Sequence, residues 1–159
     1  MIVGVTCVVV DDTLTLNGKP AEKTNDYFAQ DRQGNVWYFG EDSFDYVHGK
    51  WVRSSGSWLA GVDGAQQGIV MEAHPRVGDV YQQEFYPGHA EDMAEVLSLD
   101  ASVTVPYGSW DNALQTKEWT PLEPGVVDNK YYAPGVGEVR SLAVEGGSEE
   151  MHLVGITHM

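Results

Sequence analysis

Carboxylates are the side chains of this sequence that could carry chemistry. The sequence contains no GxSxG, HExxH, Walker or GxGxxG motif and no complete calcium loop, so the common local signatures of hydrolases, metalloproteases and nucleotide-binding sites are absent. Its single cysteine, Cys7, excludes an internal disulfide and a zinc site built from several thiolates. The five histidines are scattered. We therefore expect a site that acts through carboxylate oxygens, as acid, base or ligand of a hard cation.

The first expected hairpin, YFAQDRQGNVWYFGED, places one of these carboxylates. Its glycine supplies the positive φ of the turn, and Asp31 accepts hydrogen bonds from the turn amides. Metal binding is the alternative role of Asp31. On the returning strand, Trp37, Phe39 and Glu41 share one face because side chains alternate. Glu41 then lies either at the solvent-exposed end of this face or in the wall of a partly polar cavity.

Two further expected strands direct a carboxylate inward. Glu84 shares its face with Tyr86, and Glu118 turns inward in residues 113–120 because Lys117 faces outward. A glutamate on the surface is the alternative at both positions. Buried carboxylates without partners are costly, so several that converge would need a cation.

Asp92 and Asp63 complete the candidate set. Asp92 lies in residues 90–98, which we expect to be a strand after a Pro-Gly corner, although their composition also suits a helix. Asp63 lies in a glycine-rich loop, residues 54–67, that could cover a barrel mouth. Ca²⁺ takes 6–8 oxygen ligands, so calcium is the expected cofactor, with another divalent metal as the alternative. The expected metal ligands are Glu41, Asp63, Glu84, Asp92 and Glu118.

The elements that must position these residues are short strands separated by turn signals. The pattern shows no alternation of strands and helices and predicts an all-β fold. An antiparallel up-and-down β-barrel formed as one domain, residues 1–159, is the expected architecture, because closure removes the edges of a sheet. A sandwich is the alternative. The strands are expected in residues 2–16, with a bend at 11–12, and in residues 22–31, 36–42, 80–86, 90–98, 103–106, 113–120, 126–132, 138–144 and 150–156, and residues 46–53 contain a second turn signal at 48–50.

Charge limits the partners. The formal net charge is −15, which repels nucleic acids and anionic lipids. No apolar run reaches the roughly 20 residues that span a bilayer, and residues 1–10 lack the pattern of a signal peptide. We therefore expect a soluble chain with no nucleic-acid partner and no membrane span. Its oligomeric state is left open.

Four phrases of the sequence carry a resemblance to a known family. They are YFAQDRQGNVWYFGE, AGVDGAQQGIVM, YQQEFYPGHAEDMAEVL and EWTPLEPGVVDNKYYAPGVGEV. With them the chain looks like a family of bacterial secreted or lipoprotein domains of largely unassigned function, and like lipocalin-like, calcium-dependent phosphotriesterases from metagenomes. The resemblance implies a lipocalin-like barrel, a divalent-metal site and a parent protein exported to the periplasm or the exterior, with a lipid anchor as one option.

The implied activity is hydrolysis of neutral phosphotriesters or esters, with promiscuity toward substrates. An acidic protein does not repel a neutral ester. From their positions on the strands, Glu84 and Asp92 are the candidates for the chemical step. Trp37, Phe39 and Tyr86 would form an aromatic wall for an aryl leaving group. The competing hypothesis is a barrel of the bacterial cell envelope that binds a small apolar ligand without reaction.

Overall fold

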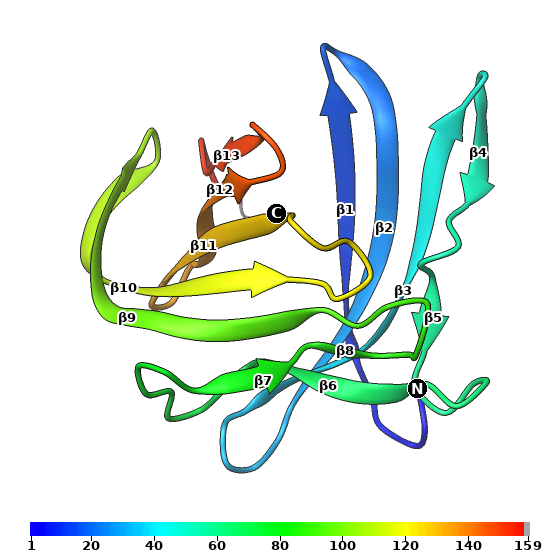
Figure 1. Ribbon diagram of the computed structural model, residues 1–159, viewed down its shortest axis with the longest axis horizontal. Coiled ribbons are helices and arrows are strands. Elements are labelled where there is room, and N and C mark those ends of the chain that lie inside the picture. Colours follow the sequence, from blue (N-terminus) through cyan, green and yellow to red (C-terminus); the bar gives the residue numbers. More distant parts are fainter. Residues whose placement is uncertain (158–159) are drawn as a thin grey trace. The chain divides into compact units, whose positions relative to one another are not determined.

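The computed structural model describes residues 1–157. His158, one of the five scattered histidines, lies outside the described residues. Within them the chain forms strands and no helix, and the strands pair antiparallel (Figure 1). The predicted all-β, antiparallel class is therefore confirmed. None of the described residues belongs to a helix long and apolar enough to cross a membrane.

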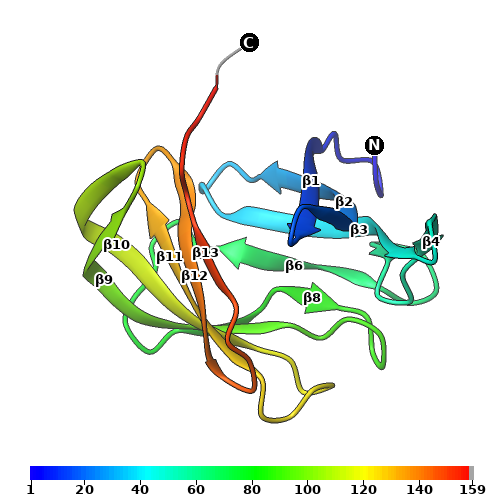
Figure 2. The same cartoon turned by 90° about the horizontal axis from the view of Figure 1, so that it is seen from above.

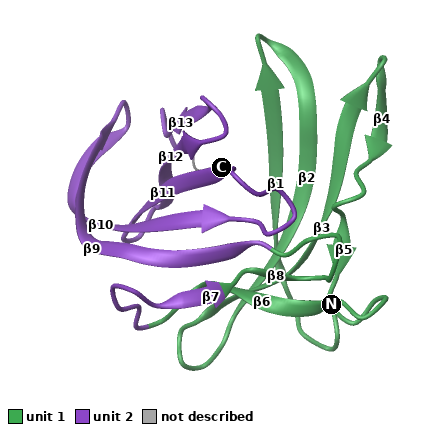
Figure 3. Cartoon of the chain, viewed as in Figure 1, with its two compact units in different colours: residues 1–73, 82–91 green, residues 74–81, 92–159 purple. Residues whose placement is uncertain are grey.

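The chain divides into two compact units, each with its own sheet (Figure 3). Unit 1 comprises residues 1–73 and 82–91, and unit 2 comprises residues 74–81 and 92–157 of the described chain. No closed barrel is found among the described residues: the two sheets remain separate. The predicted barrel is thus not confirmed.

The sheet of unit 1 is built around β3. Its strand order is β1-β2-β3-β6-β8, and β4 and β5 also pair with β3. The strands are β1 (Val8–Leu16), β2 (Lys19–Gln30), β3 (Val36–Val47), β4 (Lys50–Arg53), β5 (Trp58–Leu59), β6 (Gln66–Met71) and β8 (Glu84–Phe85).

The sheet of unit 2 follows the chain from its last strand backwards. Its order is β13-β12-β11-β10-β9-β7, so β9 to β13 pair as successive hairpins (Figure 2), while β7 lies next to β9 although β8 separates them in the chain. The strands are β7 (Val80–Gln82), β9 (Met93–Val105), β10 (Gly108–Trp119), β11 (Val127–Ala133), β12 (Gly137–Glu145) and β13 (Glu150–His152).

The predicted turns are confirmed where local chemistry determines them. β1 and β2 are joined by Asn17 and Gly18, both with positive φ (53° and 74°). This is the geometry that a two-residue hairpin loop requires. The turn between β2 and β3 lies at residues 31–35, as expected.

Several predicted strands have different bounds. Residues 2–16 do not form one strand, because β1 begins at Val8 and continues through residues 11–12 without the expected bend. Residues 80–86 divide at Gln83, where β7 of one sheet ends and β8 of the other begins. Residues 90–98 and 103–106 belong to one long strand, β9, so the strand interpretation of Met93 onward is right and the helix alternative is wrong. β6, Gln66–Met71, was not predicted from the sequence.

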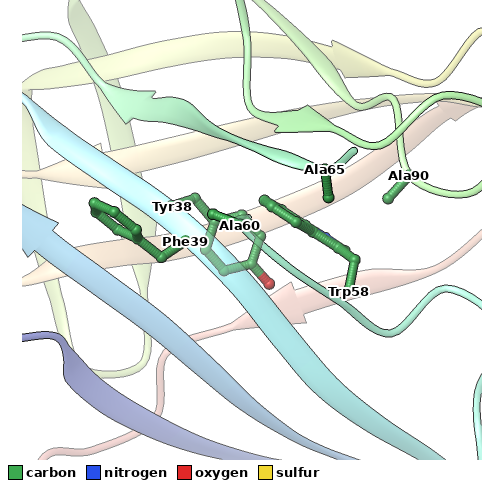
Figure 4. Packing of buried hydrophobic residues seen from close by; sticks show 6 residues of the cluster. All are labelled: Tyr38, Phe39, Trp58, Ala60, Ala65 and Ala90. Carbon is green, nitrogen blue, oxygen red and sulfur yellow. The ribbon is translucent and has the colours of Figure 1, made fainter. Parts of the chain in front are cut away.

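Each unit has its own apolar core. In unit 1, residues of β3 and β5 pack with the loops around them, and Figure 4 shows Tyr38, Phe39, Trp58, Ala60, Ala65 and Ala90 together. In unit 2, the core comprises Val103, Val105, Ala113, Ala133 and Val139. Both cores contain alanines. Polar side chains, among them Gln83, Thr116 and Glu118, are buried as well.

Candidate functional site

The hydroxyl of Tyr38 is the centre of a polar cluster in unit 1. The ring is only 7% exposed, stacks on Phe28 with centroids 4.8 Å apart, and meets the edge of Trp58 at 5.5 Å. Its hydroxyl lies 2.5 Å from Asp26 Oδ1 and 3.1 Å from Glu41 Oε2. One phenol proton thus serves two carboxylates.

A bulge in β3 brings Glu41 to this position. Phe28 pairs with Tyr38 and Asp26 pairs with Glu41, so β3 contains one more residue than β2 between these pairs. An extra residue transfers the following side chain to the other face of the strand. Glu41 therefore lies on the face of Tyr38, and the predicted face shared with Trp37 and Phe39 is wrong beyond the bulge.

Gly40 makes the bulge possible. Its φ is 123°, and a Cβ at this position would meet the backbone carbonyl of Trp58. β5 pairs with β3 at this point, Gly40 opposite Leu59. A glycine within a strand pattern indicates a bulge or a close backbone approach, and here it marks both.

Glu84 is the third carboxylate of the cluster. It lies on β8 opposite Gln67, and its Oε1 accepts a long hydrogen bond, 3.4 Å, from the indole nitrogen of Trp58. Burial is the largest cause that raises the pKa of Tyr38 above its ordinary value, and the charges of Glu41, Asp26 and Glu84 raise it further. Tyr38 therefore keeps its proton and acts as a donor.

The structure thus brings together two predicted residues, Glu41 and Glu84, and adds Asp26, which sequence reasoning missed. Asp26 lies in the first arm of the predicted hairpin, and extending the pairing across the turn would have placed it near Glu41. The missing signal was the register change at Gly40.

A small cavity lies beside Trp58. Its volume is about 130 Å³, and its lining residues are Arg53, Ser57, Trp58, Leu59, Val62, Asp63 and Tyr86. Ligand pockets usually measure roughly 300–1,000 Å³, so this cavity accommodates only a few non-hydrogen atoms. Asp63 and Tyr86, a predicted ligand and a predicted wall residue, share this cavity. Tyr86 also stacks on His89, with centroids 4.3 Å apart.

Asp31 has the structural role that its sequence position predicts. Its Oδ1 accepts hydrogen bonds from the backbone nitrogens of Gln33, Gly34 and Asn35, at 2.8, 2.8 and 3.0 Å. Its Oδ2 accepts from the Asn35 amide at 2.8 Å and from the Trp37 indole at 2.9 Å. These bonds, first that of Trp37, lower the pKa of Asp31 to about 2.

The other two aromatic residues of the predicted wall are held by the structure of unit 1. The indole nitrogen of Trp37 is engaged by Asp31, and Phe39 is buried in the core. Of the three predicted wall residues, Tyr86 is the one that lines the cavity.

A second polar cluster lies in unit 2 around Glu118, a predicted ligand. Glu118 is 7% exposed, which confirms that it turns inward. Its Oε1 accepts hydrogen bonds from Thr116 at 2.8 Å and from Tyr132 at 2.9 Å, and its Oε2 lies 3.0 Å from Lys130 Nζ. Thr116 and Lys130 are directly opposite on β10 and β11. The carboxylate is therefore fully partnered.

The charges of this cluster hold Lys130 and Tyr132 in their protonated forms. Burial lowers the pKa of Lys130, but Glu118 and Glu138 outweigh it, so the net pKa is raised. Burial and the same two glutamates raise the pKa of Tyr132 well above its usual range. Lys130 is consequently a cation and hydrogen-bond donor, unsuited to act as a nucleophile.

Asp92, the second predicted catalytic residue, borders this cluster just before β9. Burial is the main cause that raises its pKa, which a hydrogen bond from Thr120 and the charge of Lys130 partly offset, while Glu118 adds to the rise. A raised pKa makes this carboxyl group more ready to hold a proton than a free aspartate is. Asp92 and Glu118 belong to one polar cluster.

The predicted ligand set is therefore divided between the units. Glu41, Asp63 and Glu84 belong to unit 1, and Asp92 and Glu118 belong to unit 2. Within residues 1–157, no three His, Cys, Asp or Glu side chains are grouped as ligands of a metal ion would be. The carboxylates offer the oxygen donors that calcium prefers, but their arrangement does not fit a preformed calcium site.

No protein-family model matches this chain, and neither a curated protein nor a solved structure is similar enough to match. Function must therefore be argued from these two clusters and the cavity.

Proposed function

We propose that this protein hydrolyses neutral esters, phosphotriesters among them, and that the reaction uses the carboxylates around Tyr38. The observation that supports the proposal is the convergence of Asp26, Glu41 and Glu84 on one buried phenol. Like charges close to a carboxylate favour its uptake of a proton, which suits a carboxylate in such a group to act as a general base. The lipocalin-like barrel, the export of the parent protein and promiscuity toward substrates belong to the same proposal.

Glu84 is the residue we assign as general base. It would take a proton from a water molecule whose oxygen then attacks the phosphorus or carbonyl carbon of the ester. Its Oε1 accepts a hydrogen bond from the indole nitrogen of Trp58 at 3.4 Å. Trp58, which donates this hydrogen bond to Glu84, also lines the small cavity. A substrate group bound in the cavity would therefore lie next to Trp58.

Asp26 and Glu41 have the complementary role in this mechanism. They accept hydrogen bonds from the hydroxyl of Tyr38, which keeps its own proton, and the proton that Glu84 takes from the water is the one delivered to the departing alkoxide or phenoxide. The bond between the attacked atom and the leaving oxygen breaks, and that oxygen receives the proton. Asp92, the other candidate for the chemical step, lies in unit 2, and this mechanism uses residues of unit 1 alone.

A neutral substrate agrees with the charge of the protein. The formal charge of −15 repels phosphate monoesters and diesters at long range but exerts no net repulsion on a triester. Calcium, the implied cofactor, would polarise the ester oxygen, but the described carboxylates do not form a ligand set for it.

The proposal is tested with p-nitrophenyl acetate and with a dialkyl p-nitrophenyl phosphate, by the release of nitrophenolate. We expect Glu84→Gln to lower kcat by about 10²–10⁴-fold, the usual contribution of a general base. Glu145→Gln, at the exposed end of β12, is the matched control and should keep full activity. Equal rates for both variants and the unsubstituted protein would contradict the assignment.

The cavity supports the second candidate function, binding of a small apolar ligand without reaction. Trp58, Leu59, Val62 and Tyr86 supply an apolar lining. Titration of the tryptophan fluorescence with a small aromatic compound such as phenol would detect it. Saturable binding that Glu84→Gln leaves unchanged, with no turnover of either ester, would favour this function over hydrolysis.

A further inference from the structure

The first strand of unit 1 leaves one edge of its sheet unpaired. β1 pairs with β2 over its whole length, Val8 opposite Phe28 to Leu16 opposite Lys19. No other strand in residues 1–157 pairs with β1. All nine of its residues are exposed, and Figure 1 shows the β1–β2 hairpin at the end of the sheet order.

This edge has few of the features that prevent strand addition. Exposed edges are normally protected by proline, charged side chains (lysine above all), bulges or short length, and β1 has two central aspartates and one bulge near its end. β1 is nine residues long, VVVDDTLTL, with neither proline nor lysine, and its register shift lies near its end, between Leu14 and Thr15. Its apolar side chains are 45–67% exposed. They are Val8, Val9, Val10, Leu14 and Leu16.

The charged residues of β1 are adjacent and central. Asp11 and Asp12 lie between the valines and the segment Thr13 to Leu16. Because side chains alternate, the two carboxylates point to opposite faces of the sheet. A strand that adds to this edge would meet one negative charge on each face, with apolar side chains before and after them.

We infer that the edge of β1 binds an extended partner segment that carries two adjacent basic residues between apolar flanks. Every second residue of an edge strand directs its N–H and C=O to the open side, so the backbone of the partner would complete the ladder. Opposite-charge pairs across strands are favourable, while like charges directly opposite are unfavourable. Asp11 and Asp12 thus select for a basic pair.

A second copy of the chain fits this edge poorly. Antiparallel pairing of β1 with itself over all nine residues would place Asp12 directly opposite Asp12, two like charges at the centre of the ladder. Each copy also carries a formal charge of −15, which opposes association. The pattern therefore favours a different, basic segment.

The test uses two capped nonapeptides with valine and threonine flanks, one with Lys-Lys and one with Glu-Glu at the centre. Binding is measured by fluorescence anisotropy at low and physiological salt, and mapped by amide chemical shifts. We expect the Lys-Lys peptide to bind at least about tenfold more tightly than the Glu-Glu peptide and to perturb the amides of β1. N-methylation of every second peptide amide, at the residues whose N–H groups would bond to β1, should abolish binding.

Charge reversal provides the decisive variant. The double variant Asp11→Lys, Asp12→Lys should reverse the preference, so that the Glu-Glu peptide binds more tightly than the Lys-Lys peptide. The double variant Asp11→Asn, Asp12→Asn should bind both peptides equally. Circular dichroism melts check that both double variants fold. If the lysine variant does not fold, the loss of preference in the asparagine variant tests the inference. Absence of binding, an unchanged preference, shifts confined to other strands, or a dimer formed through β1 in sedimentation would each overturn the inference.

Discussion

Asp26 and Glu41 lie directly opposite each other on neighbouring strands, and the hydroxyl of Tyr38 lies within 3.1 Å of an oxygen of each. Two carboxylates in this relation repel each other unless a proton or donor lies between them. Tyr38 supplies that donor. This relationship is the basis of the proposed acid–base chemistry and of the first prediction.

Tyr38→Phe should destabilise the protein by about 1–3 kcal/mol, because it removes the shared donor and leaves buried acceptors less satisfied. The free energy of unfolding from chemical denaturation checks this expectation. Tyr46→Phe is the control, since Tyr46 is exposed at the end of β3. Equal stability of the two variants would contradict a role of the Tyr38 hydroxyl.

Gly40→Ala should destabilise by at least about 2 kcal/mol, because the residue has a strained φ for a side chain and a Cβ would collide with the backbone of β5. Gly49→Ala separates the two causes: Gly49 also has a positive φ, 82°, but has nothing within 4 Å of a Cβ. Thermal melts compare the variants. A Gly49→Ala effect as large as that of Gly40→Ala would show that the close approach of β5 contributes little.

Lys130→Met should destabilise by about 2–3 kcal/mol. The substitution leaves the buried Glu118 without its cation, and the loss is below that of a fully buried pair because the Lys130 side chain is 31% exposed. Lys117→Met, on the other face of β10 with its ammonium over Trp119, serves as control. If the double variant Lys130→Met, Glu118→Gln is no more stable than Lys130→Met alone, the ion pair is not the cause.

Asp92→Asn should stabilise the protein at neutral pH. The pKa of Asp92 is raised in the folded state, so the folded protein holds this proton more tightly than the unfolded chain does. The charged form therefore costs stability at neutral pH, and the cost disappears below the unfolded pKa of about 4. Melts from pH 3 to pH 8 should show a gain that is greatest at neutral pH. A gain independent of pH would contradict a charge effect.

Calcium dependence remains a prediction from the resemblance. If calcium takes part in hydrolysis, excess chelator should abolish the release of nitrophenolate, and added Ca²⁺ should restore it and raise the melting temperature. Magnesium and sodium at matched ionic strength are the controls. Turnover that persists in chelator would agree with the carboxylate mechanism of unit 1 and exclude a required calcium ion.

Sequence reasoning worked where the chain's local chemistry determines its path. The Asn17-Gly18 and Asp31 turns follow from the φ angles and hydrogen bonds that their own residues allow. The inward direction of Glu118 followed from simple alternation in β10, and the structure confirms it. These signals do not depend on distant residues.

The same reasoning failed where a distant strand decides the path. The bulge at Gly40 forms where β5 pairs with β3. The predicted strand 80–86 is divided at Gln83 because β7 and β8 pair in different sheets. Alternation counted along one strand cannot detect either event, and for this reason the cluster of Asp26, Glu41 and Glu84 was predicted only in part.

The turn at Asp31 has a consequence for the order in which this chain folds. All five donors to its carboxylate come from residues no more than six positions along the chain, so the turn needs no long loop closure, and closing a loop of about ten residues takes only about 10–100 ns. β3, which this turn starts, then pairs with β2, β4, β5 and β6. We therefore expect the β2–β3 hairpin to form early and to serve as the template for the slower, longer-range pairings of β3 with β5 and β6.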